Sequence, residues 1–135
     1  MNNHSSSQVI RQFFAAFGAG DVDGVVALFH PEATITAVRA GTPSAGQHHG
    51  AYLGLVGVRA FLAKLASTFD TKAFSVDHVL GEGPMACASG QFVHQLRSTG
   101  KRFESAWALV CQVEGGLIRS YRFFEDSAAF EAARA

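Results

Sequence analysis

The chain has 135 residues, which fits a single domain over 1–135. Its 11 Lys and Arg balance its 11 Asp and Glu, so we expect no nucleic-acid partner, because such binding rests on neutralising phosphates. Only 16% of the residues are charged whereas 48% are hydrophobic, which excludes a disordered chain and predicts that some apolar surface faces a cavity or a partner subunit.

The first helix is predicted near the start of the chain. Ser5 and Gln8 have the spacing of a capping box, in which each side chain satisfies a backbone N–H of the other residue. An apolar face follows at the i, i+3, i+4, i+7 spacing of a helix, formed by Ile10, Phe13, Phe14 and Phe17. Glycines after Phe17 predict the end of this helix.

Two more helices are predicted before the middle of the chain. Asp21 is the expected N-cap of the second, whose apolar face continues to Phe29 and which Pro31 should close. A β-branched strand over 34–38 and a short extended piece around Tyr52 follow, separated by a loop. The third helix is predicted from apolar residues at helical spacing: Val58, Phe61, Leu62, Leu65 and Phe69.

The second half of the chain has the alternation of strands. Turn compositions separate four strand-like segments, over 72–80, 85–97, 102–114 and 117–125. A tail helix over 127–134 follows. Helices first and an antiparallel meander second predict the α+β class, with helices packed on one face of a curved sheet.

We expect neither a membrane nor a metal site. No apolar run approaches the ~20 residues that a membrane-spanning helix needs. No secretory signal precedes the first helix, so we expect a cytoplasmic protein with Cys87 and Cys111 as reduced thiols. The pair His48 and His49 is predicted to be exposed in a loop, because adjacent strand residues point opposite ways and cannot share an ion unless the loop bends. We predict no cofactor.

Two stretches carry a family resemblance, FAAFGAGDVDGVVALFHPEAT over 14–34 and TGKRFESAWALVCQVEGGLIRSYRFFEDSAAFEAA over 99–133. With the order of elements, they resemble the NTF2-like superfamily and, within it, the SnoaL-like and ketosteroid-isomerase-like branch. The resemblance covers nearly the whole chain. It implies a cone-shaped (cystatin-like) α+β fold, with the N-terminal helices packed on a curved mixed or antiparallel sheet. This fold hosts many unrelated activities, so it identifies chemistry poorly.

The catalytic groups of ketosteroid isomerases do not carry over to this chain. Their tyrosine on the first helix corresponds to Phe13, their carboxylate base on the first strand to Ala37, and their protonated acid on the meander to Leu109. A phenyl ring cannot donate to an oxyanion and a methyl group cannot take a proton. The resemblance therefore implies that this isomerisation cannot run by that route.

Comparison with two other families of this fold leaves three titratable candidates. The Asp-Arg-Asp set of limonene-epoxide hydrolases corresponds to Phe92, His94 and Phe123, of which only His94 titrates near neutral pH. SnoaL-type polyketide cyclases depend chiefly on one acid in the cavity, and the nearest acids here are Glu125 and Asp126. Asp126 has a second interpretation as the N-cap of the tail helix.

The resemblance implies a conical cavity lined by aromatic rings, suited to a mostly apolar small molecule. The residues expected to bind this ligand are Phe13, Phe17, Phe92, Trp107, Leu109, Tyr121, Phe123 and Glu125. His94 is the expected acid or base. Each has an alternative interpretation: His94 as a half-buried strand histidine, and the rings, above all Phe13 and Phe17, as ordinary core.

The strand over 102–114 is apolar on both faces. The resemblance turns Trp107 and Leu109 inward, which leaves Ala106, Ala108 and Val110 on the outer face of the sheet. Small residues permit close packing of two sheets, and in this superfamily that face commonly pairs with a second subunit. We therefore expect a homodimer.

Three functions remain open at this point. The first is a SnoaL-like isomerase, cyclase or hydratase acting on a hydrophobic small molecule. The second is a non-catalytic carrier or sensor of such a molecule, and the third is a protein-interaction module. The resemblance favours the first by analogy, because most relatives with a cavity are enzymes or suspected enzymes.

Overall fold

Six strands form one curved, open sheet in the computed structural model, which describes residues 5–135. The order across the sheet is β2-β1-β6-β5-β4-β3, and only β1 and β6 run parallel to each other. The strands are β1 (Phe29–Ala37), β2 (Gly50–Leu53), β3 (Phe69–Glu82), β4 (Met85–Leu96), β5 (Arg102–Glu114) and β6 (Leu117–Glu125).

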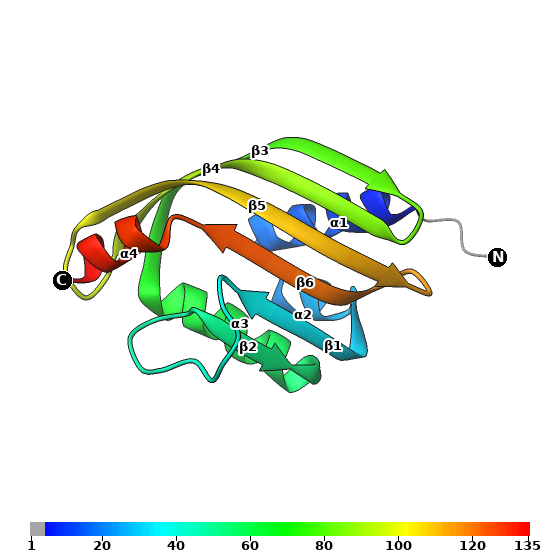
Figure 1. Cartoon of the computed structure of the whole chain (residues 1–135), viewed down its shortest axis with the longest axis horizontal. Coiled ribbons are helices and arrows are strands. Elements are labelled where there is room, and N and C mark those ends of the chain that lie inside the picture. Colours follow the sequence, from blue (N-terminus) through cyan, green and yellow to red (C-terminus); the bar gives the residue numbers. More distant parts are fainter. Residues whose placement is uncertain (1–4) are drawn as a thin grey trace.

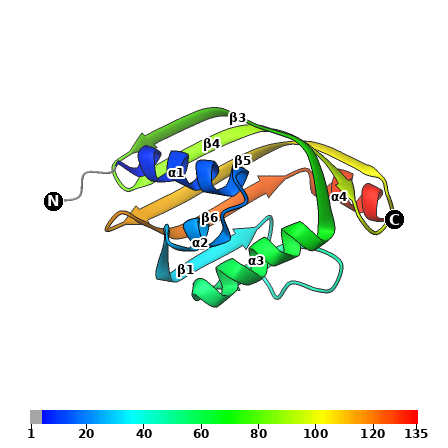
Figure 2. The ribbon, with the colours of Figure 1, turned by 180° about the vertical axis from the view of Figure 1, so that it is seen from behind.

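Three helices lie on one face of this sheet and a fourth lies at its end (Figures 1 and 2). The helices are α1 (Ser6–Gly18), α2 (Val22–Val26), α3 (Gly54–Thr68) and α4 (Ser127–Arg134). The α1 helix packs on β3, β4 and β5, whereas α3 packs on β1. The α+β prediction, with helices on a curved mixed sheet, is confirmed. Among the described helices none is both long and apolar enough to cross a membrane.

The start of α1 follows the predicted capping box. The Ser5 hydroxyl accepts a hydrogen bond from the Gln8 backbone N–H at 3.3 Å, and the Gln8 side chain accepts one from the Ser5 N–H at 2.8 Å. Ile10 and Phe13 are buried against the sheet, as the apolar spacing predicts. This cap fixes where α1 begins and therefore which of its faces meets the sheet.

The second helix is shorter than predicted. It ends at Val26, and Phe29 begins β1 by pairing with Ile118 of β6. The prediction that Pro31 closes the helix is wrong, because Pro31 lies inside β1. It lies where the β1–β6 register shifts, after Phe29 and before Thr34, and proline is tolerated at such an irregularity because the missing N–H breaks no regular pairing.

Phe69 is also placed differently from the prediction. The α3 helix ends at Thr68, and Phe69 is the first residue of β3, paired with Leu96. Its ring is buried among His48, His94 and Phe130. Phe69 therefore belongs to the wall around the histidines and not to the helix face.

The meander agrees closely with its predicted strands. The observed β5, β6 and α4 have the predicted bounds, whereas β3 starts earlier and β4 ends one residue earlier. Asp126 caps α4, since its carboxylate accepts a hydrogen bond from the Ala129 N–H at 3.0 Å. Trp107 and Leu109 are buried, and Ala106 and Ala108 are exposed, so the predicted inner and outer faces of β5 are confirmed.

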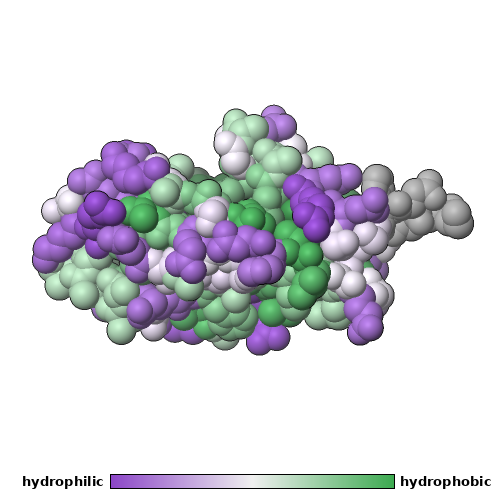
Figure 3. All heavy atoms as spheres, turned by 90° about the horizontal axis from the view of Figure 1, so that it is seen from above, coloured by the Kyte–Doolittle hydropathy of each residue, from purple (hydrophilic) through white to green (hydrophobic). Residues whose placement is uncertain are grey.

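The outer side of the sheet carries exposed apolar groups. Leu80 of β3 and Met85 of β4 are exposed there, whereas Val76, which is also exposed, pairs with Gly90 and lies on the inner side. Figure 3 shows hydrophobic spheres grouped among hydrophilic ones on the side seen from above β3. Cys87 and Cys111 are both free cysteines: Cys87 is exposed on the outer side, whereas Cys111 is buried on the inner side.

Candidate active site

A mostly apolar cavity of about 300 Å³ lies between the helices and the sheet. It is at the small end of ligand pockets, with room for a small ring system. Aromatic rings from helices and strands supply most of its wall, namely Phe14, Phe17, Phe61, Phe69, Phe74, Tyr121 and Phe123. The polar side chains that reach it are Asp21, His48, Thr71, His94 and Glu125.

Five of the nine residues predicted from sequence line this cavity. They are Phe17, His94, Tyr121, Phe123 and Glu125. The other four, Phe13, Phe92, Trp107 and Leu109, do not line it and are buried in the core. The Trp107 indole donates its N–H to the Ser75 carbonyl at 3.2 Å, so its polar edge is already used by the backbone of β3.

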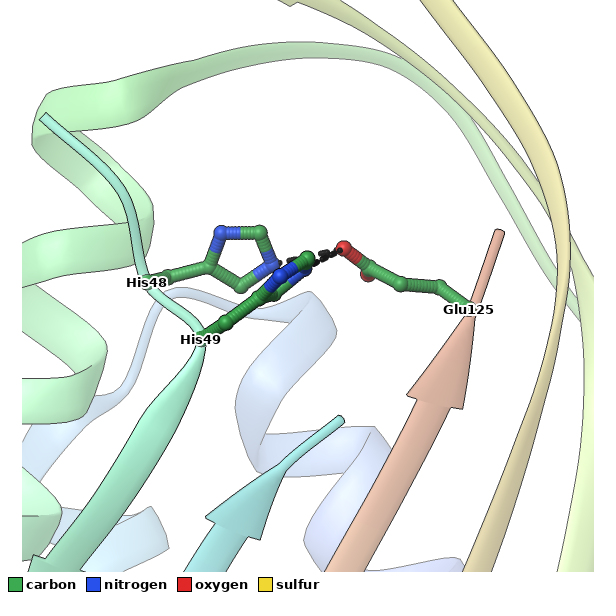
Figure 4. A group of neighbouring side chains, drawn as sticks. All are labelled: His48, His49 and Glu125. Carbon is green, nitrogen blue, oxygen red and sulfur yellow. Dashed lines mark hydrogen bonds and ion pairs between the residues drawn. The ribbon is translucent and has the colours of Figure 1, made fainter. Parts of the chain in front are cut away.

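The prediction that His48 and His49 form an exposed loop pair is wrong. Each residue is only 1% exposed, and both imidazoles point at the end of β6 (Figure 4). The Nε2 atom of His48 lies 2.7 Å from Oε2 of Glu125, and the Nε2 atom of His49 lies 2.9 Å from the same oxygen. The two rings, 4.4 Å apart between centroids, therefore hold one carboxylate oxygen between them.

The loop before β2 bends so that both imidazoles point to one side. His48 and His49 precede the strand, so the alternation of strand side chains does not apply to them. Gly50 has a φ of +144°, a value that L side chains rarely adopt, and a Cβ there would lie 2.8 Å from the Pro43 ring. The Tyr52 hydroxyl donates to the His48 carbonyl at 2.7 Å and fixes the backbone on this side of the bend.

Aromatic rings pack around the two histidines on their other sides. The His48 ring meets Phe69 and Phe130 edge to face, with centroids 5.0 Å apart in both cases. The His49 ring lies 4.9 Å from the same Phe130 ring. These rings give the imidazoles an apolar surrounding away from the cavity, which strengthens the electrostatic interactions of the cluster.

Glu125 is a buried carboxylate whose side chain is 3% exposed. Burial alone would raise its pKa, but the hydrogen bonds from His48 and His49 outweigh this effect and hold the pKa below its ordinary value. Among the described residues no Lys or Arg forms an ion pair with it. The imidazoles are therefore the groups that compensate its charge.

His94 lies between two rings, stacked on Phe69 at 4.4 Å and on Phe92 at 4.1 Å between centroids. Its Nδ1 is 2.9 Å from the Thr71 hydroxyl. Burial lowers the pKa of His94 from 6.5 to about 4, although attraction to Glu125 opposes the shift. The ring is therefore neutral at neutral pH and serves the cavity as a hydrogen-bonding group without a charge.

Tyr121 adds a second neutral polar group. Its ring packs against Phe13 at 5.3 Å and Phe61 at 6.0 Å between centroids. Burial raises the pKa of the hydroxyl well above its ordinary value, so it stays protonated. The cavity thus combines one ionised carboxylate with two neutral groups that can form hydrogen bonds.

Residues 10–121 match the SnoaL-like domain family. Among curated proteins none matches the sequence. Many solved structures are similar, including an NTF2-like protein of Burkholderia xenovorans, with 21% identity and a TM-score of 0.84 over 99% of this chain and 100% of that one. Another from Burkholderia thailandensis has 23% identity and a TM-score of 0.85 over 98% of each chain. A candidate polyketide cyclase of Pseudomonas putida has 15% identity and a TM-score of 0.78 over 98% of this chain and 100% of that one.

Proposed function

The chain belongs to the SnoaL-like domain family, and from this premise we propose that it is an enzyme that moves a proton on a mostly apolar small molecule, with Glu125 as the base. The observation that carries the proposal is one buried carboxylate at the wall of an otherwise apolar cavity. Both imidazoles bond its Oε2 atom. Within residues 5–135 no hydrogen bond uses Oε1, which is therefore available to a ligand.

The lowered pKa of Glu125 restricts the proton that it can remove. A weak base abstracts protons efficiently only from acidic carbon, such as carbon next to one or more carbonyl groups. In the proposed step, the C–H electron pair shifts toward the carbonyl oxygen as the proton passes to Oε1 of Glu125. Return of the proton at another carbon gives an isomer, and attack of the enolate carbon on a second carbonyl closes a ring.

Two neutral groups of the cavity would stabilise the oxygen that becomes negative. The Tyr121 hydroxyl stays protonated and can donate a hydrogen bond. His94 can donate from Nε2 when Thr71 donates to its Nδ1. In this scheme His94 donates a hydrogen bond during catalysis, and Glu125 removes the proton. Donors placed where charge develops are a principal source of rate enhancement.

A similar fold in a candidate polyketide cyclase of Pseudomonas putida and in TerC, which was co-crystallized with polyporic acid, agrees with a small organic ligand. A non-catalytic carrier of such a molecule is the second candidate function. It is favoured by Phe13, Ala37 and Leu109, which are buried and apolar where ketosteroid isomerases have polar groups.

Deuterium exchange into 2-tetralone, a bicyclic ketone with acidic α-hydrogens, tests the proposal. NMR in D₂O should show faster exchange with the purified chain than with buffer, and Glu125→Gln should reduce the acceleration by at least about 100-fold. His78→Ala, which removes an exposed histidine, should leave it unchanged. Binding of 2-tetralone without any acceleration by the unaltered chain would overturn the enzyme proposal and favour the carrier.

A further inference from the structure

We propose that His48, His49 and Glu125 form a mononuclear site for a divalent transition-metal ion. Their ligand atoms, two imidazole nitrogens and one carboxylate oxygen, lie within 4.8 Å of one another. Two imidazoles and one carboxylate are a donor set used by zinc enzymes and by non-haem iron enzymes. This inference goes beyond the proposed function and does not rest on it.

Two of the three distances between donor atoms are close to those around a bound ion. Metal–ligand bonds of ~2.0–2.2 Å place neighbouring donor atoms roughly 3.0–3.5 Å apart. The observed Nε2 to Oε2 distances are 2.7 and 2.9 Å, so the side chains need to move apart by only a few tenths of an ångström. Both Nε2 atoms already point at the same carboxylate oxygen, Oε2 of Glu125 (Figure 4).

The charge of the cluster also favours a cation. The Glu125 carboxyl group is almost completely buried, and within residues 5–135 it forms ion pairs only with the two histidines. A divalent ion on Oε2 would compensate the carboxylate with both imidazoles neutral. Nitrogen donors select transition metals over Mg²⁺ and Ca²⁺, which prefer oxygen ligands.

The site is rigid on one side and open on the other. Gln47 and Tyr52 hold the backbone of the two histidines by hydrogen bonds, and Phe130 packs on both rings. His48 and Glu125 border the cavity, so a bound ion would keep coordination positions for water or for an oxygen of a ligand. A ring nitrogen that binds the ion cannot also carry a proton. The metal-loaded site and the metal-free site, in which the Nε2 atoms bond Glu125, are therefore two states of the same residues.

The second coordination shell predicts moderate affinity. Metal-bound histidines usually donate their other ring N–H to a carboxylate or carbonyl, and loss of such a partner costs 10- to 100-fold in affinity. Here the Nδ1 atoms of His48 and His49 are buried and have no hydrogen-bond partner within residues 5–135. We therefore expect an exchangeable ion that a chelator removes without unfolding the chain.

Titration of the chelator-treated full chain with Co²⁺ and Zn²⁺ tests the site. We expect one equivalent of Co²⁺ to produce visible d–d absorption, and one equivalent of Zn²⁺ to bind by calorimetry. Glu125→Gln and His49→Asn should each weaken binding by at least 100-fold, whereas His78→Ala should not. Equal binding by the unaltered chain and by Glu125→Gln, or loss of binding in His78→Ala, would overturn the proposal.

A measurement on the unaltered chain keeps the test valid if a variant fails to fold. X-ray absorption of the zinc-loaded chain should show scattering from two imidazoles, and a spectrum without imidazole scattering would overturn the site. Metal binding is measured here without any substrate. Failure of the metal proposal would therefore leave the 2-tetralone result unaffected, and the reverse also holds.

Discussion

The side chain of Gln47 bonds both backbone polar groups of His49. Its carbonyl oxygen accepts the His49 N–H at 2.9 Å, and its amide donates to the His49 carbonyl at 3.0 Å. Gln47 is itself only 4% exposed. One buried amide therefore performs the pairing that a neighbouring strand would otherwise provide, and it holds the histidine segment in its bent conformation.

Gln47→Ala should destabilise the fold by about 2–6 kcal/mol. The substitution leaves a buried N–H and a buried carbonyl of His49 without partners, and each such group costs ~1–3 kcal/mol. Urea unfolding measures the change. Gln91→Ala is the matched control, since Gln91 is exposed and should change stability by less than about 0.5 kcal/mol. Equal stability of the two variants would contradict this role of Gln47.

Gly50→Ala should disrupt the bend before β2. Alanine is strained at a φ of +144°, and its Cβ would lie 2.8 Å from the Pro43 ring and 2.9 Å from the Gly41 carbonyl oxygen. We expect a loss of at least about 2 kcal/mol in unfolding free energy. Gly18→Ala, where a Cβ would meet nothing within 4 Å, should be neutral or slightly stabilising. A Gly50→Ala variant as stable as Gly18→Ala would show that the bend tolerates a side chain.

His94 should make the protein less stable as the pH falls. Its pKa is about 4 in the folded chain and 6.5 in the reference state, so the unfolded chain binds the extra proton between these values. The contribution of His94 to the free energy of unfolding is fully present above pH 6.5. It falls by up to ~1.4 kcal/mol per pH unit toward pH 4. The charged and titratable groups near it, Glu125 and His48, remain in a His94→Gln variant.

Urea unfolding at several pH values compares His94→Gln with the unaltered chain. The difference between the two slopes isolates the titration of His94, because the lowered pKa of Glu125 contributes to both proteins in the same direction. We expect the variant to have a flatter profile between pH 4 and 6.5. Parallel profiles would mean that His94 takes up its proton in the folded chain as readily as in the unfolded one.

We expect the outer face of β5 to pair with a second copy of the chain. Ala106 and Ala108 are exposed on this face, and small side chains permit close approach of two sheets. Sedimentation at micromolar concentration should report a dimer, and Ala108→Glu should convert it to a monomer through repulsion of like charges. Ser98→Glu, in an exposed turn, should leave the dimer intact. A monomer in the unaltered chain would exclude this interface.

Regular patterns made the second half of the fold predictable. Alternation in β5 and β6 specifies which side chains face inward, and Asp126 before an apolar helix specifies the start of α4. Phe29 and Phe69 were misplaced because an apolar residue at helical spacing fits a strand start equally well. Phe29 pairs with Ile118 and Phe69 pairs with Leu96. These partners, which lie far along the chain, place both phenylalanines in strands.

The candidate site was only partly predictable for a related reason. Glu125 and His94 follow from strand alternation, and both border the cavity. The partnership of His48 with Glu125 joins residues 77 positions apart through a loop that has no period. The glycines and the proline of that loop were a signal for a bend, but no local pattern gives its direction. Hydrogen bonds from Gln47 and Tyr52 determine it.

The α4 helix covers part of the cluster formed by His48, His49 and Glu125. Glu125 is followed directly by Asp126, the cap of the eight-residue α4, and Phe130 of that helix packs on both imidazoles. Short helices open at lower free-energy cost than central strands. Opening of α4 would remove Phe130 from both imidazoles and expose them to solvent while the sheet stays folded. The folding equilibrium of these eight residues would then set how often solvent reaches the cluster.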